Sequence, residues 1–412
     1  PENDKAEVVA ATDNAKEKEF EFQTDGFSIY VIAAEKAACV ELDGKSYSTI
    51  TEAINSITDQ ENETIVLLEN ISENVVSNGK NYTLNLNGKK LTSKAVGKSA
   101  YTINGGKVTI QNGTITGTKK SGSVNISGIR SANADVVLKN CVIEKNTGYS
   151  YGGGIYAEGG SFTLEDCIVT ENKATYGAGI YGLNCALEIK GKSKVNGNTG
   201  GNSYSAGGVY IKGGSFITGN GQEGSAERTV EISNNNPTST TTNGVYLLDC
   251  SAEVKDAKIS ANGFYGVEIK NTKAGNSIAF NNVEFSNHSV NSALYVNSLG
   301  DFTATNCDFI NNAFASTKKI SAALCLGDVN ASKTGSGGNK TLSNCRFLNN
   351  TAKTSVTSGA FPSGALAIKE KNQTEIEGCE FTGNSGKVGA LYTTSATVTI
   401  TGKTVFSSNE GT

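Results

Sequence analysis

The chain of 412 residues contains no Met, no Trp, a single His and only three Pro. Charged residues make up 18% of the chain and nearly cancel, which leaves a formal net charge of −4. A protein that binds nucleic acid carries a basic face, so this balance argues against that class of partner. No apolar run approaches the ~18 residues that a membrane-spanning helix requires. We therefore expect no nucleic-acid ligand and no transmembrane segment in this chain.

Closely spaced cysteine pairs are also missing. The nine Cys include no Cys-x-x-Cys spacing, which a zinc site would typically use. Their odd number and wide spacing argue against a disulfide framework. We therefore expect neither a metal ion nor another cofactor.

Glycine is plentiful where proline is scarce. With 48 Gly and 3 Pro, the turns must depend on residues that adopt a positive φ and not on the fixed ring of Pro. Asn is frequent in the same segments and also tolerates the left-handed region. This composition is typical of short strands joined by tight corners.

A phrase of six residues recurs along the chain at a period of roughly 25 residues. It runs Cys, any residue, an apolar residue, two more residues and Asn, and its copies are 141–146, 167–172, 307–312, 345–350 and 379–384. Without the Cys, the register continues at 193–198, 230–235, 257–262, 283–288 and 404–409. Alternation of period two indicates a strand whose first and third residues face inward. The third residue is Ile or Val from Ile115 to Ile259 and Phe from Phe285 to Phe406.

A second strand lies about a dozen residues before each phrase and reads Gly-Gly-aliphatic-Tyr, as in 153–156. A weaker apolar stretch, such as 161–164, lies between the two. Two to three short strands per unit cannot close a core alone, but stacked units bury a continuous one. The expected fold is all-β, a right-handed parallel β-helix of roughly eleven or more coils. We expect a right-handed helix because crossover connections between parallel strands are almost always right-handed.

The N-terminal part of the chain differs from the repeats. Residues 1–36 are charged and irregular, and their ending at 27–32 resembles the closing strand of an immunoglobulin-like module of bacterial surface proteins. We expect 1–36 to be the end of an upstream module or a linker with β-strands, and 37–412 to be the β-helix.

Residues 37–63 are expected to form an N-terminal helical cap on the first coil. Thr49 and Glu52 have the spacing of a capping box. They precede an apolar stripe at helical spacing, made of Ile50, Ala53, Ile54 and Ile57. Such a helix would cover strand edges that are otherwise exposed.

The Gly-Gly strand, together with the Phe-x-x-Asn phrases at 309–312, 347–350, 381–384 and 406–409, resembles the repeats of chlamydial-type polymorphic outer membrane proteins. Those repeats belong to the broad pectin-lyase-like superfamily of right-handed β-helices. The resemblance spans roughly residues 108–409 and implies an adhesin-like surface protein. The same fold also hosts lyases and hydrolases, so the site must decide the function.

The recurring Cys and Asn residues are expected to be structural. Five Cys share one inward-facing column, where parallel Cβ vectors suit a disulfide poorly and a small apolar thiol fills space well. His288 stands where the other coils place Asn. We expect these Asn to form a ladder of hydrogen bonds from coil to coil that satisfies the backbone at the corner.

The candidate ligand-binding residues are tyrosines that directly follow the buried aliphatic residue of the second strand: Tyr156, Tyr181, Tyr210, Tyr246, Tyr295 and Tyr392. Alternation turns them outward on one sheet face, and Glu268 at the equivalent position of one coil supports their exposure. Two interpretations stay open. The rings form a ladder that stabilises the sheet, or they form an exposed aromatic face that binds a ligand. In the second case, replacing Tyr181 and Tyr210 with Ala would abolish binding and leave thermal unfolding nearly unchanged.

Catalytic residues cannot be assigned from the sequence. The three arginines, Arg130, Arg228 and Arg346, are isolated from one another in the sequence, and Glu165-Asp166 is the nearest approach to an acidic pair. A glycosidase needs two carboxyl groups at a fixed separation of ~5 to 9.5 Å, which only a site assembled across coils could supply here.

We therefore favour a monomeric, secreted or cell-surface bacterial protein that acts as an adhesin-like binding or structural module for a glycan or for a host or matrix protein. The alternative is a polysaccharide-active enzyme, a lyase or glycoside hydrolase. Insertions in solenoids project from corners and often carry recognition. The further candidates for a recognition surface are therefore the insertions 213–228, 333–340 and 352–363.

Overall fold

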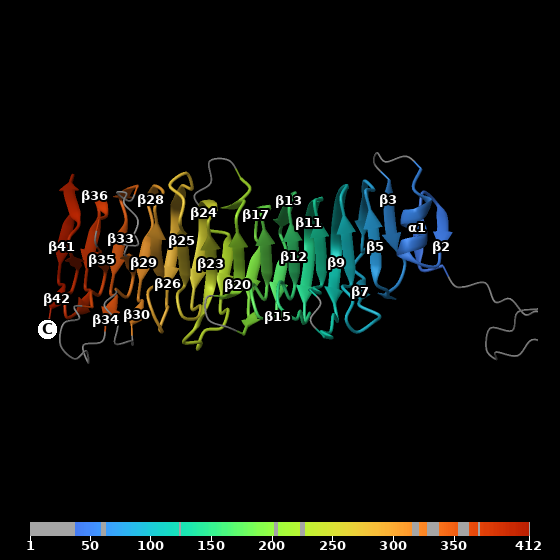
Figure 1. The fold of residues 1–412 in the computed structure, drawn as a ribbon, viewed down its shortest axis with the longest axis horizontal. Coiled ribbons are helices and arrows are strands. Elements are labelled where there is room, and N and C mark those ends of the chain that lie inside the picture. Colours follow the sequence, from blue (N-terminus) through green and yellow to red (C-terminus); the bar gives the residue numbers. More distant parts are fainter. Residues whose placement is uncertain are drawn as a thin grey trace, which may run out of the picture. The chain divides into compact units, whose positions relative to one another are not determined.

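The computed structural model describes residues 38–58, 63–122, 125–201, 205–222, 227–314, 321–327, 338–352, 362–369 and 371–411. The segment 1–36, expected to end an upstream module, lies outside the described residues, as do most of the insertions 333–340 and 352–363. From residue 38 onward the chain winds in coils that follow one another along one axis, from the helix α1 to the last strands (Figure 1).

One side of the solenoid is a parallel sheet of twelve strands, one from each of about twelve coils. Its strands are β5 (Val75–Asn78), β8 (Tyr101–Asn104), β10 (Ile129–Ala132), β12 (Ile155–Glu158), β16 (Ile180–Leu183), β20 (Ser205–Lys212), β23 (Thr242–Leu248), β25 (Val267–Asn271), β27 (Leu294–Ser298), β31 (Leu324–Leu326), β35 (Leu366–Ile368) and β39 (Leu391–Thr393). These are the expected Gly-Gly-aliphatic-Tyr strands and their equivalents.

The opposite side is a sheet of 24 strands that carries two rows. The first row contains β3 (Thr64–Leu67), β6 (Tyr82–Asn85), β13 (Ser161–Glu165), β17 (Ala186–Lys190), β21 (Ser215–Gly219), β28 (Phe302–Thr305), β32 (Asn339–Ser343), β36 (Gln373–Glu377) and β40 (Thr397–Thr401). The second row, which holds the repeated phrase, contains β4 (Ile71–Ser72), β7 (Lys90–Thr92), β14 (Ile168–Thr170), β18 (Lys194–Asn196), β22 (Val230–Ser233), β29 (Asp308–Ile310), β33 (Arg346–Leu348), β37 (Glu380–Thr382) and β41 (Val405–Ser407). Both rows are spanned by the long strands β9 (Lys107–Thr116), β11 (Asp135–Glu144), β24 (Ser251–Ser260) and β26 (Ile278–Ser286).

The remaining strands are short. A first hairpin pairs antiparallel and is made of β1 (Val40–Leu42) and β2 (Lys45–Tyr47). Corner strands stack in parallel beside the two large sheets, as β15 (Lys173–Ala174), β19 (Thr199–Gly200), β30 (Ala313–Phe314), β34 (Thr351–Ala352), β38 (Ser385–Gly386) and β42 (Glu410–Gly411).

The inward-facing columns form the predicted core. The Cys of all five repeated phrases are buried, and the structure gives each as a free thiol. The third-position column is a continuous stack of phenylalanine rings in the C-terminal coils. Phe285, Phe309, Phe347, Phe381 and Phe406 stack at centroid distances of 4.6–4.8 Å. The predicted change from aliphatic to aromatic core is confirmed.

Asn side chains form the predicted ladder after the second row. The Oδ1 of Asn172 accepts a hydrogen bond from the backbone N–H of Asn146 at 3.0 Å, and its Nδ2 donates to the carbonyl of Ile143 at 2.8 Å. His288 takes one rung, since its Nδ1 accepts from the N–H of Asn262 at 3.3 Å. Burial lowers the pKa of His288 to about 4, so its ring is neutral at physiological pH. The structural role expected for His288 is confirmed.

The corners use the backbone conformations that the composition predicts. Between the two rows of the 24-stranded sheet, most coils have a residue with a positive φ, such as Asn112, Asn140 and Asp166 at 50–59° and Gly191 at 67°. Gly suits this region because it has no Cβ, and Asn and Asp because their short side chains can bond locally. Stacking therefore repeats one strained corner along the solenoid.

Helix α1 (Ile50–Ser56) begins at the predicted residue. Thr49 is its N-cap and accepts a hydrogen bond from the N–H of Glu52 at 3.1 Å. In a capping box the Glu52 carboxylate would accept from the N–H of the N-cap residue, Thr49. Here it accepts instead from the N–H of the preceding residue, Ser48, at 3.1 Å. The apolar side chains on one side of the helix are buried.

Candidate ligand-binding face

The predicted tyrosines occupy one outward-facing column of the twelve-stranded sheet. Tyr156, Tyr181, Tyr210 and Tyr246 are register partners on four successive strands. Glu268 and Tyr295 continue the column. Two small residues, Cys325 and Ala367, separate Tyr295 from Tyr392. The structure therefore stacks Tyr156, Tyr181, Tyr210 and Tyr246 in continuous contact. Glu268 separates Tyr295 from these four, and Tyr392 lies farther along the column.

The four rings stack along the axis of the solenoid. Ring centroids lie 5.6 Å apart for Tyr156 and Tyr181, and 5.0 Å apart for the next two pairs. A second row, Tyr151 and Tyr176, packs against them from the corner, with the rings of Tyr151 and Tyr181 only 4.6 Å apart. The sequence analysis missed this row, although each member lies five residues before a ladder tyrosine.

The expectation that the ladder is exposed is wrong. The exposed fractions of Tyr156, Tyr181, Tyr210 and Tyr246 are 5%, 5%, 7% and 3%. Alternation does turn them away from the core, but each ring covers the face of the next, and the second row with Leu183 and Leu248 packs over them. Burial accordingly raises the pKa of Tyr156 and Tyr210 to about 12. Truncating these rings should destabilise the protein, contrary to the expectation from sequence.

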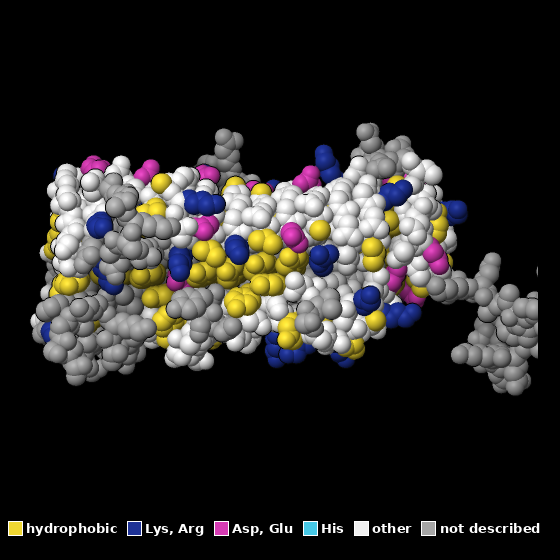
Figure 2. All heavy atoms as spheres, viewed as in Figure 1, with side chains coloured by type: hydrophobic (Ala, Val, Ile, Leu, Met, Phe, Trp, Pro, Cys, Tyr) yellow, Lys and Arg dark blue, Asp and Glu magenta, His cyan; other side chains and the backbone are white. Residues whose placement is uncertain are grey.

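The surface that remains is an apolar stripe of partly exposed side chains above the ladder. We use the term apolar stripe for Tyr151, Tyr176, Leu183 and Leu248 together with the edges of the four ladder rings. Figure 2 shows apolar side chains gathered in a band that runs along this sheet, with single charged groups beside it.

The column that contains Leu183 and Leu248 also places charged groups beside the stripe, which we call its rim. Charged and apolar residues alternate in this column from coil to coil, as Glu158, Leu183, Lys212, Leu248 and Lys270. The hydroxyl of Tyr156 donates to the Glu158 carboxylate at 3.0 Å. Hydrogen-bonding groups therefore lie beside apolar surface along several coils.

Glu268 interrupts the ladder as a buried carboxyl group. Its Oε2 accepts a hydrogen bond from Asn243 Nδ2 at 2.7 Å. Burial raises the pKa of Glu268 to about 7, against the opposing effects of Asn243 and Lys270. The Glu268 carboxyl therefore keeps its proton to a higher pH than an ordinary glutamate side chain.

At the N-terminal end of the ladder, the Arg130 guanidinium lies over the ring of Tyr156, 5.7 Å from its centroid. Arg130 also borders a hollow of about 370 Å³ together with Lys98, Ser99, Thr102 and Asn125. This hollow lies on the outer face of the same sheet, because Thr102 and Arg130 precede Tyr156 in the tyrosine column.

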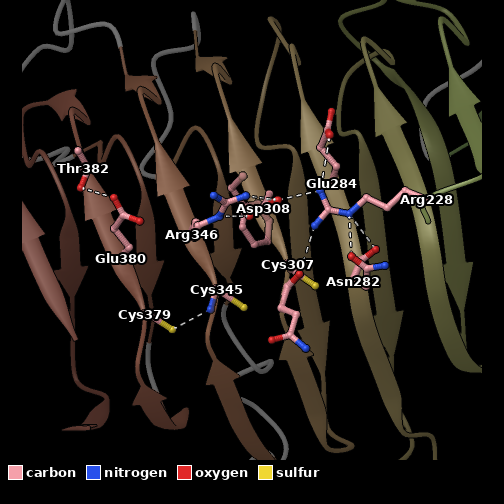
Figure 3. A network of polar contacts seen from close by, with 12 residues as sticks. Arg228, Asn282, Glu284, Cys307, Asp308, Cys345, Arg346, Cys379, Glu380 and Thr382 are labelled. Atoms are coloured by element: carbon pink, nitrogen blue, oxygen red, sulfur yellow. Dashed lines mark hydrogen bonds and ion pairs between the residues drawn. The ribbon is translucent and has the colours of Figure 1, made fainter. Parts of the chain in front are cut away.

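Two arginines that are distant in sequence converge on Asp308 (Figure 3). Arg346 donates to it from Nε at 2.6 Å, and Arg228 donates from a guanidinium nitrogen at 2.7 Å. Burial would raise the pKa of Asp308, but the hydrogen bonds from Arg346 and Arg228 outweigh it and lower the pKa. Arg228 and Arg346 are isolated from each other in the sequence, but the structure brings both to one carboxylate. Part of the expected insertion 213–228 is regular structure, because it contains β21.

A second hollow gathers acidic residues on the opposite sheet. It has a volume of about 540 Å³ and is bordered by Glu165, Asp166 and Glu227 together with Lys190 and Lys192. Glu165 lies within 3.8 Å of Lys190 and 3.4 Å of Lys139. Asp166 accepts from the N–H of Lys192 at 2.8 Å. At least two of these carboxylates are thus already engaged with neighbouring coils.

Comparison with known families agrees with this architecture. Residues 207–405 match the family model described as the right handed beta helix region. The fold is a right-handed parallel β-helix. No curated protein and no solved structure matches the chain. The resemblance to polymorphic outer membrane proteins stays a prediction.

Two further findings concern the described part of the β-helix. Its one helix, α1, is too short to cross a membrane. Across the described ranges, no three His, Cys, Asp or Glu residues are grouped in a way that could hold a metal ion.

Proposed function

We propose that this β-helix is a glycan-binding module and that an extended polysaccharide lies along the apolar stripe. The observation that carries the proposal is the alternation of apolar and hydrogen-bonding side chains over at least five successive coils. A sugar ring presents apolar C–H faces and a rim of hydroxyls, so it suits a surface of amphipathic aromatic and apolar side chains with nearby polar groups. A repeating polymer also suits a surface that repeats every ~4.8 Å.

Replacing Leu183 and Leu248 together with Gln is expected to weaken glycan binding by at least ~10-fold, because both side chains contribute partly exposed apolar surface to the stripe. The fold should tolerate the change, since neither residue belongs to the main core. Binding is measured by titration calorimetry against polysaccharides first identified on a glycan array.

The matched control is the double substitution of Ile168 and Ile217 with Gln. Both are 37% exposed, and both lie on the opposite sheet. The control should bind like the unsubstituted protein. Equal affinities for the stripe variant and the unsubstituted protein would contradict the proposal.

A second candidate function, polysaccharide cleavage, rests on the acidic hollow of Glu165, Asp166 and Glu227. A reducing-sugar assay and an assay for unsaturated products on the polymers that bind would detect a hydrolase or a lyase. Loss of product formation in the Glu227→Gln variant, with binding retained, would favour an enzyme. Absence of product with every bound polymer favours a binding module.

The remaining expectations fit this proposal as parts of it. We place the protein outside the cell or on the surface of a bacterium, as an adhesin-like monomer, with a host or matrix protein as the alternative to a glycan ligand. We also propose that α1 shields the first coil, because its buried face contains Ile50, Ala53 and Ile54. The segment 1–36 remains a candidate end of an upstream module.

A further inference from the structure

Among the described residues, those that border the hollow at Arg130 include two cations and no acidic residue. Lys98 and Arg130 border it, and the other bordering side chains are neutral, among them Ser99, Thr102 and Asn125. The chain as a whole has more acidic than basic residues, 40 against 36. A hollow with cations alone is therefore a local reversal of the charge of the protein.

Neither cation is neutralised within the described part of the chain. Arg228 and Arg346 both bind Asp308, whereas Arg130 and Lys98 form no ion pair with any described residue. The Glu158 carboxylate, on the strand after that of Arg130, accepts a hydrogen bond from the Tyr156 hydroxyl. Two uncompensated cations at one hollow favour an anionic ligand.

The position of Arg130 suits recognition of a planar or tetrahedral anion. Its guanidinium lies over the Tyr156 ring, which limits its orientation while its N–H groups stay available. A guanidinium fork matches the two oxygens of a carboxylate or of a sulfate ester. Ser99 accepts from the N–H of Ser127 at 3.2 Å, so its hydroxyl proton remains for a ligand oxygen.

We propose that this hollow binds the carboxylate or sulfate group of an acidic glycan whose chain continues along the apolar stripe. The inference rests on the proposed function and names its ligand class. From Arg130 to Leu248 the chain advances four coils, or about 19 Å along the axis. Lys212 provides a further cation along that path, and Lys270 lies one coil beyond Leu248.

The test compares Arg130→Gln, Lys98→Gln and the double variant, with polygalacturonate and dextran sulfate as anionic probes. We expect about 10-fold weaker binding for each single variant and about 100-fold for the double, with a smaller dependence on salt. Arg130→Lys keeps the charge but loses the fork, so it should lie between the unsubstituted protein and Arg130→Gln. The control Lys107→Gln, in β9 of the opposite sheet, should leave affinity unchanged.

The possible outcomes separate the two proposals. Weaker binding of either polymer supports the anionic hollow and identifies the group that it takes. If the Arg130 and Lys98 variants bind both polymers as before while the Leu183 and Leu248 variant still loses affinity, the proposal for the hollow is wrong. The proposal that glycans bind along the stripe then stands. If the unsubstituted protein binds no glycan at all, both proposals fail. Circular dichroism and thermal unfolding of each variant verify the fold, and Arg130→Lys provides the readout if Arg130→Gln does not fold.

Discussion

Replacing Phe347 with Ala is expected to lower the free energy of unfolding by about 3–5 kcal/mol. Phe347 is fully buried, and the rings of Phe309 and Phe381 stack on its two faces at 4.7 and 4.6 Å. The substitution leaves a cavity between two aromatic rings that the adjacent coils cannot close, because their spacing is set by backbone hydrogen bonds. Chemical denaturation followed by circular dichroism measures the loss.

Phe406→Ala is the matched control for this prediction. Phe406 belongs to the same stack and lies 4.7 Å from the ring of Phe381, but it is 45% exposed. Its truncation should cost less than about half as much as that of Phe347. Equal losses for the two variants would show that stacking within the column is not what stabilises these coils.

Replacing Glu268 with Gln is expected to remove about 3 kcal/mol of destabilisation that the protein acquires on going from acid to neutral pH. The pKa of Glu268 is raised to about 7 in the folded state by burial, from a usual value of 4.5. The folded protein therefore holds a proton that the unfolded chain releases between these values. This contribution to stability is complete below pH ~4.5 and is lost as the pH rises through about 7.

Unfolding free energies of Glu268→Gln and the unsubstituted protein should hence converge near pH 4 and differ most near pH 8. Glu253→Gln, at an exposed position of β24, serves as the control and should follow the pH dependence of the unsubstituted protein. A difference between Glu268→Gln and the unsubstituted protein that does not change between pH 4 and pH 8 would contradict the assignment.

The fold and the core could be predicted because the pattern that carries them is local and repeated. Alternation within a phrase determines which side chains face inward, and repetition then places Cys141 above Cys167 and Phe309 above Phe347. The role of His288 followed from the same register, since it replaces Asn in one rung.

The candidate site was predicted less well because exposure depends on segments that lie across coils. Alternation correctly turned Tyr181 away from the core, yet it contains no information on Tyr151 and Leu183, which pack over the ladder. The contact of Arg228 with Asp308 joins residues 80 positions apart, which no local pattern indicates.

Lys340 shows the same limit inside the core. It is the register partner of Phe302 in a buried column, where an apolar residue is expected. Its Nζ donates to the carbonyls of Ser298, Gly300 and Gly338 at 3.1, 2.6 and 2.9 Å. Ser298 and Gly300 lie at a bend of the adjacent coil and Gly338 directly precedes the strand of Lys340, so the strand pattern could not reveal these acceptors. Burial lowers the pKa of Lys340 to about 8.

Hydroxyl-radical footprinting with and without a bound polysaccharide tests most directly whether the apolar stripe is the ligand-binding face. The method reports the solvent exposure of individual side chains, and it can compare the two sheets in a single experiment. We predict that the ligand protects Tyr151, Tyr176, Leu183 and Leu248 and leaves Ile168 and Ile217 on the opposite sheet as reactive as before. Protection of Ile168 and Ile217 with no change at the stripe would contradict the account.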